Sequence, residues 1–216
     1  MFAAVIFDLD GTLADTLEDI ADAMNRVLRR EGFPGYDYAA YRYLIGRGMR
    51  NLVIQALPAG DRADDTIARC LAELLADYSE HFLVKTSLYE GVAELLGELR
   101  AAGVGLAVLS NKVDELTRGI VDGLTEPGTF DVVMGAQAGV PLKPDPAAAL
   151  LVSVRLGVSP EAVAYVGDSG VDMRTATAAG MLPVGVTWGF RTKDELVENG
   201  ARAVLDQPLD LLALRQ

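Results

Sequence analysis

The sequence predicts an α/β protein: a doubly wound parallel sheet with an inserted all-α domain. Short apolar runs rich in β-branched residues end in Asp, Ser, Thr or Gly, as expected of strands buried on both faces of a parallel sheet. Helical patterns follow most of these runs, and alternation of strand and helix is typical of this fold class. A long, purely helical stretch after the first run predicts the insertion.

The apolar runs predict five strands, and the periodic segments between them predict helices. The strands are expected at residues 3–7, 105–109, 132–134, 163–166 and 183–186. Helices are expected at 92–102, 114–124, 145–156 and 171–179. Gly103, Gly157 and Gly180 lie where glycine commonly ends a helix.

The segment from Thr16 to about Lys85 contains no buried-strand run. Its helical patterns cover residues 17–30, 38–43, 49–57 and 66–82. Roughly 70 residues is far more than a crossover between parallel strands needs. We therefore expect a helical cap domain at residues 16–85 and an α/β core formed by residues 1–15 and 86–216.

Composition excludes several classes of protein. The 216 residues include 19 basic and 31 acidic side chains, a net charge of −12, which argues against nucleic acid or an anionic membrane as a partner. The single cysteine, Cys70, rules out an intrachain disulfide and a cysteine-based zinc site. No targeting segment is visible. We expect a cytoplasmic protein, monomeric or homodimeric.

The first predicted strand runs directly into Asp8-Leu9-Asp10-Gly11-Thr12-Leu13. Alternation along an extended chain puts Asp8 and Asp10 on one face, where the two carboxylates require a cation or a shared proton. The backbone N–H groups of Gly11 and Thr12 are candidates to bind an anion. A turn that caps the following helix is the alternative interpretation.

Three later segments carry similar polar residues. Ser110 and Asn111 follow the second strand and suit either a phosphoryl oxygen or a helix N-cap. Lys143 stands among three prolines and is either a fixed cation or a solvated lysine. Asp168 ends the fourth strand and completes a set of oxygen ligands suited to Mg²⁺, whereas Asp172 also suits the first turn of a helix.

These residues also predict the strand order. Asp8, Ser110 and Asp168 meet only if the first strand lies between the second and the fourth. Such a position is a topological switch point, where open α/β sheets bind ligands beyond the carboxyl ends of their strands.

The chain resembles the haloacid dehalogenase-like superfamily, which has a Rossmann-like core. The four motifs of that superfamily match, in order, Asp8-Leu9-Asp10-Gly11-Thr12-Leu13, Ser110, Lys143 in Lys-Pro-Asp-Pro, and Gly167-Asp168-Ser169-Gly170-Val171-Asp172. The helical insertion resembles the cap of its phosphatases. Ile45-Gly46-Arg47-Gly48-Met49-Arg50 and Trp188-Gly189-Phe190-Arg191 are similar to its phosphoglycolate phosphatase branch.

The resemblance implies a role for each motif residue. Asp8 would attack phosphorus and form an aspartyl phosphate, while Asp10 would act as general acid and then as general base. Mg²⁺ would be held by Asp8, Asp168 and the backbone carbonyl of Asp10. Ser110 and Lys143 would hold the phosphoryl group, and Asp172 would support the site from behind.

The function predicted is therefore a Mg²⁺-dependent phosphatase acting on a small phosphorylated metabolite, with 2-phosphoglycolate as the first candidate. Arg47 and Arg50 are candidates for binding a second anionic group on the substrate, or form a solvated pair at a helix edge. A β-phosphoglucomutase-like phosphomutase or a pyrophosphatase is the alternative on the same scaffold. A phospho-receiver signalling domain is the alternative from another class.

Overall fold

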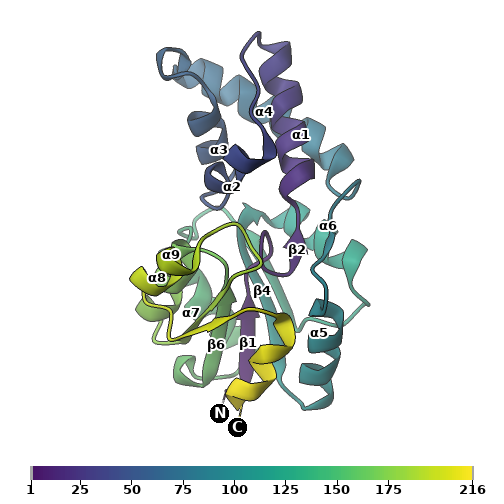
Figure 1. The fold of residues 1–216 in the computed structure, drawn as a ribbon, viewed down its shortest axis with the longest axis vertical. Coiled ribbons are helices and arrows are strands. Elements are labelled where there is room, and N and C mark those ends of the chain that lie inside the picture. Colours follow the sequence, from purple (N-terminus) through teal and green to yellow (C-terminus); the bar gives the residue numbers. More distant parts are fainter. Residues whose placement is uncertain (1, 216) are drawn as a thin grey trace.

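The structure is a computed structural model that describes residues 2–215, with a sheet domain below and a helical insertion above it (Figure 1). Its main sheet has six strands in the order β5-β4-β1-β6-β7-β8, all parallel. The strands are β1 (Ala4–Phe7), β4 (Gly105–Val113), β5 (Val132–Ala136), β6 (Val163–Gly167), β7 (Leu182–Val186) and β8 (Ala203–Leu205). The predicted position of β1 between the second and fourth of the expected strands is confirmed.

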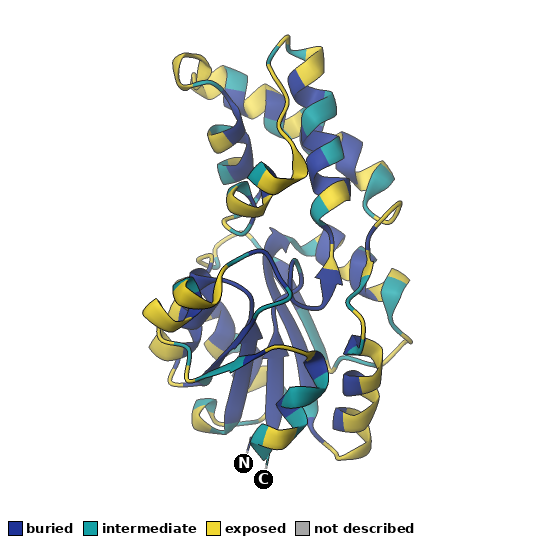
Figure 2. Cartoon of the chain, in the orientation of Figure 1, coloured by how far each residue is buried: buried dark blue, intermediate teal, exposed yellow. Residues whose placement is uncertain are grey.

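Both faces of the sheet are covered by helices, and the central strands are dark blue in the burial colouring of Figure 2. Alternate residues of β1 enter different cores: Val5 and Phe7 belong to one cluster, and Ala4 and Ile6 to the other. One face packs against α5 (Val92–Ala101) and α6 (Asp114–Leu124), and the other against α7 (Ala147–Leu156) and α8 (Gly170–Ala178). An all-apolar β1 is therefore what a two-sided core requires.

The insertion packs around a second hydrophobic cluster that consists mainly of its own residues, including the buried side chains of Met24, Tyr41 and Leu74. Its helices are α1 (Leu17–Arg30), α2 (Tyr38–Leu44), α3 (Met49–Ala56) and α4 (Asp64–His81). The chain leaves the core through β2 (Ala14–Asp15) and returns through β3 (Ser87–Leu88), and these two short strands pair antiparallel. We propose residues 16–85 as the cap and residues 1–15 and 86–216 as the core.

The structure differs from the predicted elements mainly beyond the fifth expected strand. Helix α9 (Lys193–Glu198) and the edge strand β8 were not predicted. Strand β4 runs four residues further than expected, with a register shift against β5 between Leu109 and Val113. Gly103, Gly157 and Gly180 have positive φ angles, as expected of helix ends. Among residues 2–215, no helix is both long enough and apolar enough to cross a bilayer.

Candidate active site

Asp8 stands where β1 ends, at the carboxyl edge of the sheet. Its backbone N–H still bonds to the carbonyl of Val166 at 2.9 Å, so the strand pairing fixes its position. The side chain is buried, and its Oδ1 accepts a bond from the N–H of Leu9 at 2.7 Å. Asp10 comes from the same loop, and its Oδ1 accepts the hydroxyl of Thr16 at 2.6 Å.

The loop after Asp8 is tighter than the sequence suggested. Gly11 has a φ of +82°, and a Cβ there would lie 2.4 Å from an oxygen of Asp168, so only glycine fits. The N–H of Gly11 donates to Ala14 and that of Thr12 to Leu9. Contrary to expectation, these two N–H groups are used within the turn and are not free to bind an anion in this conformation.

Ser110 and Asn111 lie within the final residues of β4, not after the strand as predicted. Both side chains are buried and line a cavity beside Asp8. The amide of Asn111 donates to the carbonyls of Lys143 (3.1 Å) and Gly46 (3.3 Å) and accepts the N–H of Lys143 at 2.9 Å. Asn111 therefore connects the lysine loop to the cap, and Ser110 is the better placed of the two to meet a ligand.

Lys143 is a buried cation, not a solvated one. Its ammonium lies 2.9 Å from Asp8 and 2.7 Å from Asp172, and it donates to the carbonyl of Leu109 at 3.2 Å. Burial opposes its charge, but the carboxylates of Asp172 and Asp8 raise the pKa of Lys143 well above its ordinary value. Lys143 therefore stays charged and holds together two acids from different segments.

Asp168 and Asp172 come from the end of β6 and the first turn of α8. Ser169 and Asp172 form a capping box, with the serine hydroxyl 2.5 Å from the Asp172 carboxylate. Asp168 accepts the N–H of Phe190 at 2.7 Å. Asp172 lies in the first turn of a helix, as one interpretation expected, and its contact with Lys143 supports the proposal that it holds the site from behind.

The three buried aspartates Asp8, Asp168 and Asp172 form one cluster, with one carboxylate oxygen from each lying within 4.8 Å of the others. Burial, and then the charge of Asp172, raise the pKa of Asp8 well above its usual range. The same two causes raise the pKa of Asp168 to about 7. Such a site, with three acids and one lysine, favours uptake of a further cation.

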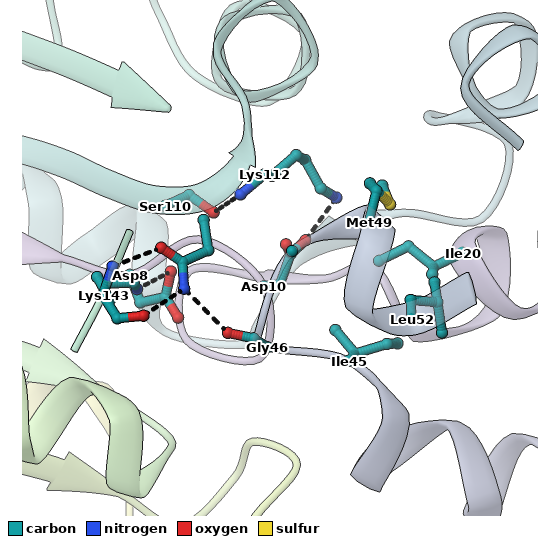
Figure 3. Close-up of a pocket in the computed structure, with 12 residues that line it drawn as sticks. Asp8, Asp10, Ile20, Ile45, Gly46, Met49, Leu52, Ser110, Lys112 and Lys143 are labelled. Carbon is teal, nitrogen blue, oxygen red and sulfur yellow. Dashed lines mark hydrogen bonds and ion pairs between the residues drawn. The ribbon is translucent and has the colours of Figure 1, made fainter. Parts of the chain in front are cut away.

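The cavity beside this cluster lies between core and cap and measures about 30 Å³. Figure 3 shows Asp8 and Lys143 at one side, Asp10 in the middle, and the cap side chains of Ile20, Met49 and Leu52 at the other side. The candidate substrate arginines are not in it. Arg47 is exposed and lines a separate groove, and Arg50 is exposed and lies 3.4 Å from Asp64.

Two sets of contacts at the site were not predicted from the sequence. Lys112, two residues beyond Ser110, is buried with its ammonium 2.6 Å from Asp10; a lysine ending an apolar strand was the available signal. The segment from Trp188 to Arg191 ties the first loop to the cap. The Trp188 indole donates to the carbonyl of Thr12 at 3.0 Å, and Arg42 of the cap donates to the carbonyl of Gly189.

Comparison with known proteins identifies the class. The sequence profile of the haloacid dehalogenase-like hydrolases matches residues 5–186, and the chain belongs to this family. A phosphoglycolate phosphatase of Rhodospirillum rubrum is 38% identical over 94% of this chain and 86% of its own. One from Pseudomonas putida is 37% identical over 97% of this chain and 77% of its own. The chain is an enzyme of the phosphoric monoester hydrolase class.

Solved structures agree in fold. A protein of Haemophilus somnus, described as a predicted phosphoglycolate phosphatase, superposes with a TM-score of 0.91 at 28% identity, covering 100% of this chain and 98% of the other. CbbY from Rhodobacter sphaeroides, solved in complex with phosphate, gives a TM-score of 0.81 at 26% identity over 98% and 96% of the two chains. Both matches span the sheet domain and the helical insertion together.

Proposed function

We propose that this enzyme is a Mg²⁺-dependent phosphatase that hydrolyses a small phosphate monoester through an aspartyl phosphate on Asp8, with 2-phosphoglycolate as substrate. The observation that carries the proposal is the cluster of three buried aspartates around Lys143, with Asp10 beside it under the cap. The names of the relatives support the choice of substrate.

The residues present fit a divalent cation. Asp8 and Asp168 would hold it through their carboxylates and Asp10 through its backbone carbonyl, a set of hard oxygen donors that suits Mg²⁺. The raised pKa values of Asp8 and Asp168 support this, because carboxylates that lack enough positive charge nearby take up protons instead. When bound, Mg²⁺ would neutralise charge on the phosphoryl oxygens.

The reaction divides into two displacements. An oxygen of Asp8 bonds to phosphorus as the bond from phosphorus to the substrate's alkoxide breaks, and Asp10 gives its proton to that alkoxide. Water then attacks the aspartyl phosphate, Asp10 takes the proton from water, and phosphate leaves with Asp8 restored. Ser110 and Lys143 would hold the phosphoryl group, and Asp172 would hold Lys143 in place.

The cap supports a small substrate. A cavity of about 30 Å³ has room for about two water molecules, so we infer that the cap moves to admit substrate and that the closed site excludes bulk water. The buried, unpaired Cys70 supports a cytoplasmic location.

The alternatives differ in the fate of the phosphoryl group. Membership of the hydrolase family excludes the phospho-receiver. A phosphomutase transfers the phosphoryl group back to a bound sugar instead of to water, and a pyrophosphatase cleaves a phosphoanhydride instead of a phosphate ester.

A phosphate-release screen over 2-phosphoglycolate, sugar phosphates and pyrophosphate, with Mg²⁺ or with EDTA, tests the proposal. We expect release from 2-phosphoglycolate with Mg²⁺ and without a bisphosphate activator. Release only from pyrophosphate, or turnover only in the presence of a sugar bisphosphate, would contradict it.

A further inference from the structure

The proposed mechanism leaves one buried charge of the cavity without a function. Lys112 is the last residue but one of β4, and its side chain is 1% exposed. Its ammonium lies 2.6 Å from Asp10 and 2.8 Å from the hydroxyl of Tyr78, which belongs to helix α4 of the cap. Figure 3 shows this ammonium beside Asp10, facing the cap side chains. Burying a lysine is costly, so its position beside Asp10 calls for a function.

The two lysines of the cavity differ in their partners. An ammonium has three N–H donors. Lys143 donates to Asp172 and to the carbonyl of Leu109 and forms an ion pair with Asp8, so its ammonium lies at the nucleophile end of the cavity. Within residues 2–215, Lys112 has two bonding partners, Asp10 and Tyr78. One donor of Lys112 is therefore left for a ligand.

The rest of the leaving-group side of the cavity is apolar. Its cap wall consists of Ile20, Ile45, Met49 and Leu52 with the backbone of Gly46 and Gly48, and the cavity is lined by no arginine. An anionic group that packs against this apolar wall loses its hydration and needs direct contact with a cation. Lys112 is the cation next to Asp10, the residue that would protonate the leaving oxygen.

We propose that Lys112 binds a carboxylate on the leaving group, so that the enzyme selects phosphate esters of short hydroxy acids over uncharged esters of the same size. This inference rests on the proposed function. Tyr78 is a positioning residue: its hydroxyl and its ring, whose centroid is 4.7 Å from the ammonium, hold Lys112 from the cap. Specificity would thus depend on a core residue together with a cap residue.

The test compares 2-phosphoglycolate with 2-hydroxyethyl phosphate, which has CH₂OH in place of the carboxylate. We expect wild-type enzyme to prefer 2-phosphoglycolate in kcat/KM. Lys112→Met should lower that preference about 10- to 100-fold, the size of one charge-assisted hydrogen bond, whereas Lys112→Arg should keep most of it. Lys193→Met, which removes an exposed lysine of α9, should leave the preference unchanged.

Tyr78→Phe keeps the ring and removes only the hydroxyl, which makes it the variant of choice if Lys112→Met fails to fold. For the carboxylate ester it should raise KM a fewfold and change kcat little, and for the hydroxyethyl ester it should change both constants little. Equal losses on both esters in Lys112→Met, or a selective loss in Arg47→Met instead, would overturn the inference and leave the phosphatase proposal standing. If the wild-type enzyme hydrolysed neither ester, the proposed function itself would be overturned.

Discussion

At the scale of the residue, the carboxylate of Asp8 is held between a lysine and two further aspartates. Lys143 offsets part of the repulsion, and the remaining excess of negative charge, added to burial, keeps the pKa of Asp8 raised. A protonated Asp8 would be a poor nucleophile, so under the proposed mechanism the reactivity of Asp8 would depend on the divalent cation that this environment favours. This links the proposed Mg²⁺ dependence to the nucleophile.

Asp8→Asn tests the nucleophile. The amide has nearly the same shape and removes one of three repelling carboxylates, so we expect a folded protein with turnover lower by at least about 10³-fold. Phosphate release and circular dichroism check the two halves of this prediction. Asp15→Asn, which changes the exposed residue of the short strand β2, is the matched control and should keep its activity. Appreciable turnover in Asp8→Asn would show that another group attacks phosphorus.

Asp10→Asn tests the acid and base function. Because the same carboxyl would protonate the leaving group and deprotonate water, both half-reactions should slow by about 10²- to 10⁴-fold. Rapid-quench measurements of aspartyl phosphate formation and decay separate the two. If only one half-reaction slows, Asp10 does not serve both steps.

Sequence reasoning located five of the site residues that the structure brings together: Asp8, Asp10, Ser110, Lys143 and Asp168. The aspartates follow strands closely and Ser110 lies near the end of one, whereas Lys143 comes from the loop after β5. Parallel strands bring their carboxyl ends to one edge. The behaviour of individual N–H groups was not predictable in this way. The N–H groups of Gly11 and Thr12 donate to carbonyls within the turn. Whether they do so or point toward a ligand depends on backbone angles that residue type does not determine.

At the scale of the element, Asp19 connects the two chain crossings between cap and core. It lies in the first turn of α1, and its buried carboxylate accepts the backbone N–H groups of Lys85 and Thr86 at 2.9 Å and the Thr86 hydroxyl at 2.8 Å. These donors belong to the returning segment, so one side chain joins the start of the cap to its end.

Asp19→Ala should therefore destabilise the protein by about 2–4 kcal/mol, since it leaves two backbone donors near Asp19 without their charged acceptor. Asp22→Ala removes a neighbouring acid of the same helix that meets Lys85 only at its ammonium, 2.9 Å away and partly exposed, and should cost less than about 1 kcal/mol. Urea unfolding monitored by fluorescence measures both. Equal costs for the two variants would show that the hydrogen bonds of Asp19 contribute no more than a surface ion pair.

The elements that were predicted well are those with a strong periodic pattern: α1 and α6 begin and end at the expected residues. Those missed are short. Strand β8 has three residues at the sheet edge and α9 has six, too few to show a period. The length of β4 was underestimated because its last residues are polar, yet they are buried under the cap. Burial by a distant segment is invisible in local sequence.

At the scale of the whole molecule, the strand order followed from requiring the polar strand ends to meet. The orientation of the cap on the core could not be predicted in this way, because it depends on contacts between segments far apart in sequence. Arg47 illustrates this: its motif lies over the site, but the side chain faces the separate groove outside. Substrate binding by Arg47 would require its side chain to point into the cavity, and the spacing of residues in the sequence does not determine where a side chain points.

Charge at the site should also make the stability of the whole molecule depend on pH and Mg²⁺. An aspartate in the unfolded chain has a pKa of about 3.9, whereas the native pKa of Asp168 is about 7 and that of Asp8 is also raised. Between about pH 4 and pH 7 the native state thus binds protons that the unfolded chain has released. Stability of the metal-free protein therefore falls as pH rises through this window.

Other acids have a pKa that is lowered by their partners, such as Asp77 beside Arg26 and Asp114 beside Arg118. Their contribution to stability is already complete at pH values above the pKa of the unfolded chain. They therefore do not oppose the fall in stability between pH 5 and pH 7.5. We expect the Tm in EDTA to fall on the order of 5 °C between pH 5 and pH 7.5 and Mg²⁺ to restore it. Asp168→Asn should weaken both effects. A Tm in EDTA that stays level or rises over this range would mean that Asp168 and Asp8 are already ionised at pH 5, and that the cluster does not need a cation.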